Sequence, residues 1–339
     1  MLLLLLNNLA LNIVTLGFYR FWARTRLRRY LWGNVELLGD PFVYSGTGTE
    51  LFKGFLVALA VLVPLGTLSV AIKFIPDPSI NEGVKFLFFI LVLYLIFFAI
   101  FSARRYRLSR SMWRGVRFGL SGKAADYAKR KLLWTLLMLI SLGFASPWLM
   151  VKEQKYLAER VSFGDRHFSF DGRGGDLLWS WLLVYLTLGL GYPWFLVRRF
   201  RYIVNQTSLG EAHFGSTVRF LPILERLVAM AGISIFLPLI ILAPIAALLY
   251  VLKGALPTNI WDFFASGVPA LILFAVIALL FASIGQLLTS PILYIPILRH
   301  ICATLSISNA TSLDSIAQSA QSLPATGEGL ADAFDVGLT

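Results

Sequence analysis

An apolar segment that ends in aromatic residues and then in a row of arginines recurs along this chain, and it constrains the fold more than any other feature. In the first copy, Thr15-Leu16-Gly17 precedes Trp22, a basic stretch from Arg24 to Arg29, and Tyr30. This order of groups is expected where a helix leaves a bilayer, because aromatic rings favour the headgroup level and cations meet anionic lipid. The pattern therefore predicts membrane helices.

The copies are related by fixed sequence offsets. The stretch from Thr15 to Leu51 matches the stretch from Ser141 to Leu177 at one offset of 126 residues, and Pro147-Trp148 matches Pro193-Trp194 at an offset of 46. We expect a repeat-built transmembrane domain over residues 1–304, followed by a polar, acidic tail at 305–339. The predicted copies are residues 1–51, 84–127, 131–176 and 177–222, with a weaker, degenerate copy at 268–304.

Composition supports a membrane class. The chain is 58% hydrophobic and only 14% charged, whereas about a quarter of residues are charged in soluble domains. The net charge of +12 comes from arginines beside apolar segments, so we expect no nucleic-acid partner and attribute the charge to membrane orientation. The period-two aromatics from Phe42 to Gly48 indicate short strands or hairpins. We predict an all-α polytopic membrane protein of about seven hydrophobic helices in an internal-repeat arrangement, with short juxtamembrane β-like hairpins.

The side of the third copy's loop stays open at this stage. The basic loop 104–131 is expected in the cytoplasm by the positive-inside rule. If segments 132–151 and 177–197 each span once, which we favour, the loop 152–176 lies outside. If homologous loops share a side, the two segments are re-entrant or interfacial, with kinks at Pro147 and Pro193. The hydrophobic segments are residues 1–22, read as a retained span, 51–75, broken near Pro64, 84–103, 132–151, 177–197, 223–252 and 268–297.

Four polar residues are candidates for an ion or solute site. Glu50 and Asp176 are equivalent positions at the mouths of two apolar segments, and an ionisable group at membrane depth is a functional candidate. Their ordinary interpretation is charge that complements a helix N-terminus. Asn8 and Asn12 lie one helical turn apart and need partners in lipid. No catalytic or metal-ligand pattern stands out, so we expect neither an enzyme nor a cofactor.

Two further sets of residues are expected at the membrane surface. The first holds cations that bind lipid headgroups or set topology: Arg24, Arg26, Arg28, Arg29, Arg104, Arg105, Arg107, Arg110, Arg198, Arg199 and Arg201. The second holds interfacial aromatics: Trp22, Tyr30, Trp148, Tyr156, Trp194 and Tyr202. The expected partners are membrane lipids, chiefly anionic ones, and the sequence identifies no protein partner.

Four stretches together resemble the YjgN-type bacterial inner-membrane proteins, a family of unknown function. They are TLGFYRFWARTRLRRYLW, the F-x-Y-x-G-x-G-x-E-L element at 42–51, SRSMWRGVRFGLSG, and the closing GEGLADAFDVG. The resemblance implies a multi-pass protein of the bacterial inner membrane and assigns no catalytic residues. Two functions remain open: binding or transport of a solute, for which an anion is the favoured class, and a lipid-contacting structural or assembly role in the cell envelope. We favour the first.

Overall fold

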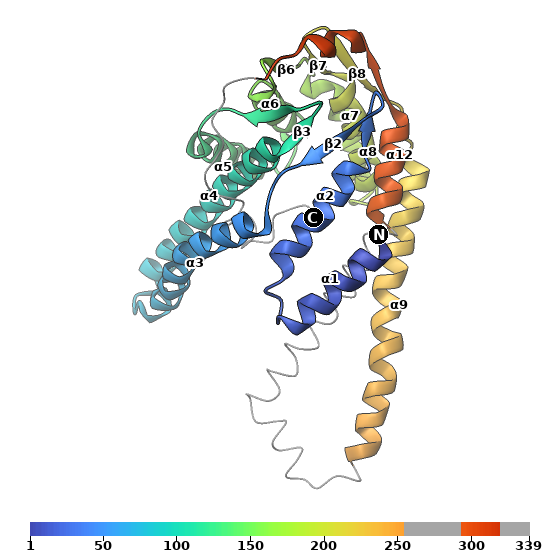
Figure 1. The fold of residues 1–339 in the computed structure, drawn as a ribbon. Coiled ribbons are helices and arrows are strands. Elements are labelled where there is room, and N and C mark those ends of the chain that lie inside the picture. Colours follow the sequence, from blue (N-terminus) through green and yellow to red (C-terminus); the bar gives the residue numbers. More distant parts are fainter. Residues whose placement is uncertain (254–292, 319–339) are drawn as a thin grey trace. The chain divides into compact units, whose positions relative to one another are not determined.

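The computed structural model describes residues 1–253 and 293–318, in which helices alternate with short strands (Figure 1). The α-helices are α1 (Leu2–Val14), α2 (Arg20–Gly33), α3 (Gly48–Ala71), α4 (Pro78–Arg110), α5 (Ala124–Ile140), α6 (Ser146–Ala158), α7 (Leu178–Leu186), α8 (Tyr192–Asn205), α9 (Phe220–Lys253) and α12 (Ile295–Thr304). The strands are β1 (Glu36–Leu37), β2 (Asp40–Tyr44), β3 (Ser111–Trp113), β4 (Val116–Leu120), β5 (Val161–Phe163), β6 (Arg166–Phe170), β7 (Thr207–Leu209), β8 (Ala212–Ser216) and β9 (Leu305–Ser308). Short 3-10 turns are η1 (Ile72–Phe74), η2 (Gly174–Leu177) and η4 (Ala310–Ser315).

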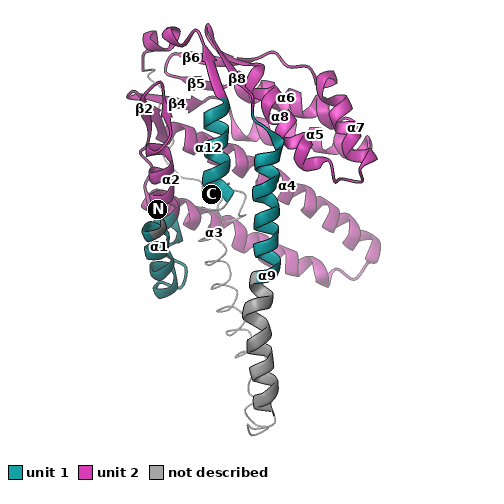
Figure 2. Cartoon of the chain, turned by 90° about the vertical axis from the view of Figure 1, so that its right-hand side faces the viewer, with its two compact units in different colours: residues 1–23, 218–304 teal, residues 24–217, 305–339 magenta. Residues whose placement is uncertain are grey.

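The chain divides into two compact units, shown in teal and magenta in Figure 2. Unit 1 comprises residues 1–23 and 218–304, and unit 2 comprises residues 24–217 and 305–339. Residues 305–318, the first part of the predicted acidic tail, form β9 and η4. The rest of that tail, and most of the degenerate copy and seventh segment predicted after residue 267, lie outside the described residues.

Within residues 1–253 and 293–318, the strands form one nine-stranded antiparallel sheet in which each strand pairs with the next along the chain. Strands β1 and β2, and likewise β3 and β4, are joined by two-residue turns. Both residues of each turn, Leu38-Gly39 and Arg114-Gly115, have positive φ. This left-handed pair matches the twist of the flanking strands, which is why such turns close tight hairpins.

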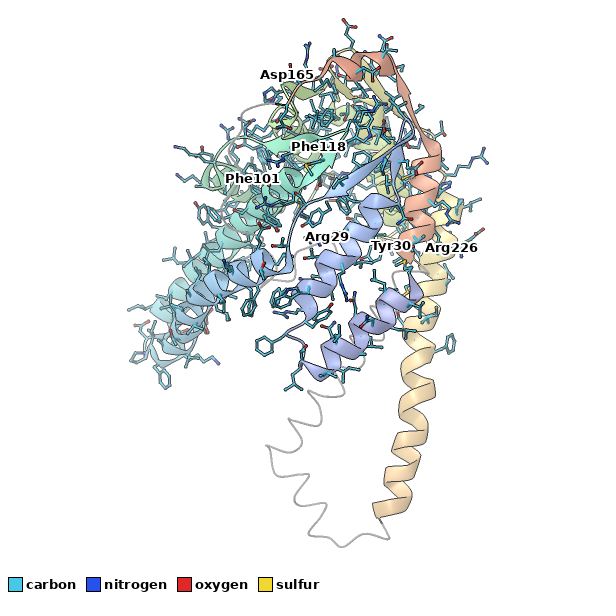
Figure 3. The ribbon with its side chains drawn as sticks, in the orientation of Figure 1. Arg29, Tyr30, Phe101, Phe118, Asp165 and Arg226 are labelled. Carbon is cyan, nitrogen blue, oxygen red and sulfur yellow. The ribbon has the colours of Figure 1, made fainter. Side chains whose placement is uncertain are left out.

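Aromatic side chains from successive hairpins stack on one face of the sheet. Phe42 lies opposite Trp113 and Phe118 lies opposite Phe163, with ring centroids 6.4 and 4.7 Å apart. Leu313 in η4 is buried against this same cluster. Figure 3 labels Phe118 within the sheet. Cross-strand aromatic pairs therefore hold one hairpin to the next.

Two strands end in an aromatic residue that is followed, two positions later, by a glycine. Only glycine fits there, because the aromatic ring lies against its Cα. A Cβ on Gly46 would lie 2.7 Å from the ring of Tyr44, and one on Gly172 would lie 2.4 Å from the ring of Phe170. The aromatic side chain folds over the glycine two residues later, so the aromatic-x-glycine spacing is a packing requirement.

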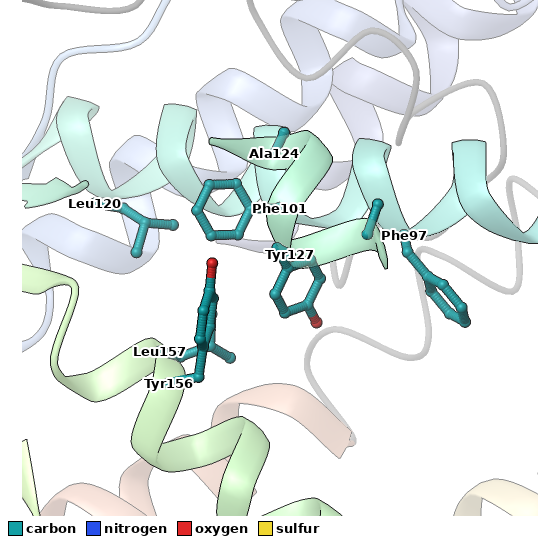
Figure 4. Packing of buried hydrophobic residues seen from close by; sticks show 8 residues of the cluster. Phe97, Phe101, Leu120, Ala124, Tyr127, Tyr156 and Leu157 are labelled. Carbon is teal, nitrogen blue, oxygen red and sulfur yellow. The ribbon is translucent and has the colours of Figure 1, made fainter. Parts of the chain in front are cut away.

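A second apolar cluster joins helices α4, α5 and α6 where they meet the sheet. Phe101, Tyr127, Tyr156 and Leu157 point toward one another there (Figure 4). The Tyr127 hydroxyl donates a 2.6 Å hydrogen bond to Glu153, whose other oxygen is bonded by Lys131. The ends of these helices are thus fixed by both packing and polar contacts.

The prediction of an all-α bundle of about seven hydrophobic helices is wrong. The hairpins are joined into a continuous sheet, and in the described residues only two helical stretches, 48–74 and 78–110, are long and apolar enough to cross a membrane. The break expected near Pro64 is absent, because α3 runs through that proline. The segments 132–151 and 177–197, predicted as single spans, each divide into two helices, and their prolines lie in the first turn of the second helix.

Candidate membrane interface

The helical hairpins α5–α6 and α7–α8 turn on the same three-residue element. In Ser141-Leu142-Gly143, Leu142 and Gly143 have φ of +50° and +85°, and the Gly143 N–H bonds the Met138 carbonyl at 2.7 Å. In Thr187-Leu188-Gly189 the corresponding φ values are +50° and +91°, and the Gly189 N–H bonds Val184 O at 2.8 Å. This is the six-to-one bond of a helix-terminating motif, so both helices stop for a local backbone reason.

The hydroxyl of each element starts the next helix. Ser141 Oγ accepts from the Ala145 N–H at 3.1 Å, and Thr187 Oγ1 accepts from the Gly191 N–H at 2.8 Å. Thr15 makes the same contact with the N–H of Tyr19, after a turn in which Leu16 and Gly17 also have positive φ. The side chain thereby satisfies an N–H that the turn would otherwise leave without a partner.

Side chains of α7 satisfy the carbonyls at the α5–α6 turn. The Tyr185 hydroxyl donates to Leu142 O at 2.7 Å, and the Trp181 indole N–H donates to Gly143 O at 3.0 Å. The Tyr185 ring also stacks on Phe144, with centroids 4.9 Å apart. Satisfied backbone groups are the condition for placing a turn in hydrocarbon. Sequence reasoning missed Trp181 and Tyr185, because their partners are about forty positions away.

The tips of these hairpins expose large apolar side chains. Leu142 retains 80% of its accessible surface and Leu188 retains 94%, and Ile140, Leu186 and Leu190 are comparably exposed. On the two long helices, Val57, Phe86 and Leu87 also face outward. Extended apolar surfaces of this kind mark a membrane or protein interface.

The predicted arginines occupy several different environments. Arg28 is only 2% exposed and donates to the Tyr44 hydroxyl, while Arg29 donates to Gly46 O. Arg105 donates to Gly122 O at 2.8 Å, and Arg110 pairs with Glu50. Arg198 lies over the Trp194 ring. Exposed cations of the set are Arg26, Arg29, Arg198 and Arg201, while Arg24, Arg104, Arg107 and Arg199 are half-buried.

Glu50 is held by three donors at the start of α3. Its oxygens accept from the Tyr106 hydroxyl at 2.6 Å, from Arg110 Nη2 at 2.7 Å and from the Thr47 N–H at 3.3 Å. With Thr47 it forms a reciprocal capping box, which stabilises the first helical turn. The carboxylate therefore has structural partners, and its role as an ion site stays a prediction.

Asp176 has the corresponding place before α7 but a more open setting. It accepts one bond, at 2.6 Å, from the Tyr202 hydroxyl, which also donates to Arg173 O at 3.0 Å. Burial, together with the bond to Asp176, raises the pKa of Tyr202 to about 12, because both disfavour the phenolate. Asp176 itself is exposed.

Asn8 and Asn12 are buried on α1, at 6% and 8% exposure. Asn8 donates to Ala23 O at 3.4 Å, and within the described part of the chain the side-chain oxygens of both asparagines have no hydrogen-bond partner. Buried amide oxygens without partners are costly, so these two atoms are candidates for contact with a ligand or another protein.

The predicted interfacial aromatics are divided between surface and core. Trp148 is exposed. Tyr156 is buried beneath Arg160, whose guanidinium carbon lies 3.7 Å from the centroid of the Tyr156 ring. Trp22 stacks on Tyr19, and Tyr30 is half-buried. No group of three or more His, Cys, Asp or Glu residues is placed to hold a metal ion in the ranges that the structure describes.

Comparisons with known proteins agree with a membrane setting. The family model described as a bacterial protein of unknown function, DUF898, matches residues 2–182 and 174–289. The relative named inner membrane protein YjgN from Salmonella typhimurium is 31% identical over 114 residues, which cover 34% of this chain and 27% of the relative. The Escherichia coli K12 protein of the same name is 31% identical over 137 residues, or 40% and 32% of the two chains. The chain thus aligns with about a third of the length of these relatives, and no solved structure matches it.

Proposed function

This chain belongs to DUF898, a family of bacterial proteins of unknown function, and we propose that it is a non-enzymatic protein whose role is to contact lipid. It is a protein of the bacterial inner membrane, as its relatives are named. In this proposal the apolar helices lie among acyl chains and the exposed arginines bind anionic headgroups.

The exposed apolar tips carry the proposal. Transfer of a leucine from water to an apolar phase is worth about 1.5–3 kcal/mol, so the five exposed residues near the two tips represent on the order of 10 kcal/mol. That is comparable with the whole stability of an ordinary domain, about 5–15 kcal/mol. Acyl chains are the surroundings in which such a surface is favourable in a membrane protein.

Cations on α8 supply the headgroup contact. Arg198 and Arg201 are exposed, and they follow directly on the apolar first turns of the helix from Tyr192 to Val197. Each cation near an anionic membrane surface contributes about 1 kcal/mol. The Arg198 guanidinium, 5.6 Å from the Trp194 ring, lies beside an aromatic residue of the kind found at headgroup level.

Lipid-dependent stability tests this function. Phosphatidylglycerol added to the detergent-purified protein should raise its melting temperature more than phosphatidylcholine does. The double substitution Arg198→Gln and Arg201→Gln should reduce that difference. Lys73→Gln with Lys85→Gln, which removes the same charge near the α3–α4 connection, is the matched control and should retain it. Equal stabilisation by both lipids in the unmodified protein would contradict the proposal.

A second candidate is binding or transport of an anionic solute, and the buried side-chain amides of Asn8 and Asn12 favour it, because an amide N–H group can donate to an anion. Chloride flux into proteoliposomes tests this candidate directly. Flux above that of empty vesicles, and its loss in Asn12→Leu, would favour transport. The lipid-contacting role predicts no flux.

We also propose that the chain is built from copies of one unit of helix, hairpin and helix. Two observations support this. The turns at Thr15, Ser141 and Thr187 share one backbone geometry, and the hairpin turns at Leu38 and Arg114 share another. Glu50 and Asp176 each accept a tyrosine hydroxyl from the helix that precedes the next hairpin.

A further inference from the structure

Three helical excursions in the described part of unit 2 each leave one strand and return to the strand that pairs with it. Helices α3 and α4 connect β2 to β3, which pair at Phe42 and Trp113. Helices α5 and α6 connect β4 to β5, and α7 and α8 connect β6 to β7, which also pair. Paired strands lie about 4.8 Å apart, whereas the hydrocarbon core is about 30 Å thick. Both ends of each excursion therefore lie on one side of the membrane.

Such an excursion must cross the bilayer an even number of times or not at all. At about 1.5 Å per residue, the 24 residues of α3 and the 33 of α4 are long enough for one crossing each. The nine residues of α7 extend only about 14 Å, half of the core. The apolar part of α5 that follows Lys131 has the same length. These two excursions are too short to cross and return.

We propose that α5–α6 and α7–α8 are half-membrane hairpins that enter the leaflet on the side of the sheet and turn back among its acyl chains. The inference rests on the proposed lipid-contacting function and identifies the occupant of the apolar tips as the acyl chains of one leaflet. Three features fit that place: the exposed Leu142 and Leu188, the hydroxyls that bond the turn N–H groups, and the donors Trp181 and Tyr185 on the turn carbonyls.

The charge of the loops indicates on which side of the membrane the sheet lies. The stretch 104–131, between the end of α4 and α5, holds ten Lys or Arg residues and one acid, Asp126, and such loops remain in the cytoplasm. Strands β3 and β4 lie within it and belong to the same sheet as β5–β8. The loop 152–176 is therefore cytoplasmic as well, and the inner leaflet is the one entered.

Cysteine accessibility in spheroplasts tests whether the sheet lies on the cytoplasmic side of the membrane. In the full chain with Cys302→Ser, single reporters are placed at Ser79 beside the α3–α4 connection, Lys123 after β4, and His167 in β6, all exposed positions. We expect an impermeant maleimide to label Ser79→Cys in intact spheroplasts, and to label Lys123→Cys and His167→Cys only after lysis. Labelling of His167→Cys in intact spheroplasts would overturn the inference.

Depth is measured separately with a fluorophore on Leu142→Cys or Leu188→Cys in proteoliposomes. Lipids brominated along the acyl chain should quench both labels strongly, and an aqueous quencher should not. Strong aqueous quenching would overturn the half-membrane placement. The proposed function has its own readout, because equal stabilisation of the unmodified protein by phosphatidylglycerol and phosphatidylcholine, with His167→Cys labelled only after lysis, would reject headgroup binding alone. Preserved lipid dependence with an external His167→Cys would reject the hairpins alone.

Discussion

Replacement of Glu50 by alanine removes a carboxylate that joins the start of α3 to the end of α4. Tyr106, Arg110 and the Thr47 N–H each lose an acceptor. Breaking a buried ion pair costs about 3–5 kcal/mol. Because the side chains of Glu50 and Arg110 retain 29% and 15% of their accessibility, water partly replaces the lost partner, and we expect a loss of about 2–3 kcal/mol.

The assay is reversible unfolding in mixed micelles as the fraction of denaturing detergent is raised, followed by tryptophan fluorescence. Asp176→Ala is the matched control, because it occupies the corresponding position but is exposed and accepts one bond. It should cost less than about 1 kcal/mol. Tyr106→Phe, which removes a single donor, should also cost about 1 kcal/mol. Equal losses for Glu50→Ala and Asp176→Ala would refute the burial argument. Unchanged stability in Glu50→Ala, with loss of an ion flux, would instead support the ion site.

Three further predictions concern the hairpins and their bases. Gly189→Ala should cost about 1–2 kcal/mol, the cost of placing an L-residue in the left-handed region, because the φ of Gly189 is +91°. No clash adds to this cost, since a Cβ at Gly189 would meet no atom within 4 Å. Gly143→Ala should cost more in the same assay, because its Cβ would lie 2.2 Å from the Tyr185 hydroxyl. Leu188→Lys should lower the yield of folded membrane protein, since a central cation costs about 2.5–3.5 kcal/mol, whereas Glu211→Lys at an exposed sheet turn should not. The stability contribution of Tyr202 is complete below pH 10.0 and is lost as the pH rises to about 12, so Tyr202→Phe should reduce the pH dependence of unfolding in that window.

The two long spans could be predicted because length and apolar composition are sufficient to define a crossing. The predicted segment 84–103 lies within the apolar stretch 78–110, and the predicted segment 51–75 ends one residue beyond the apolar stretch 48–74. The same criterion of length and apolar composition predicted a single span at 132–151. Twenty apolar residues suit either one crossing or a hairpin of half the depth. Pro147 suggested a kink, but it occupies the first turn of α6, where its missing N–H has no cost.

The sheet could be anticipated only in pieces. The alternation around Phe42 and Tyr44 indicates a strand locally, and β2 occupies residues 40–44. Its partner, β3, lies some seventy positions later, and no local pattern specifies the register of Phe42 with Trp113. The burial of Arg28 could not be predicted either. A row of arginines does not indicate which of them turns toward Tyr44 and becomes buried.

Sidedness illustrates how a non-local contact outweighs a local rule. Counting apolar segments predicts that successive loops alternate across the membrane, and the balanced charges of 152–176 offered no contrary signal. The pairing of β4 with β5 and of β6 with β7 ties that loop to both neighbouring hairpins. Hydrogen-bonded strands cannot be divided by a hydrocarbon layer about 30 Å thick. For chains of this design, we infer that strand pairing determines whether an apolar run spans or turns back, and that a Thr/Ser-Leu-Gly element at the middle of the run is the local sign of turning back.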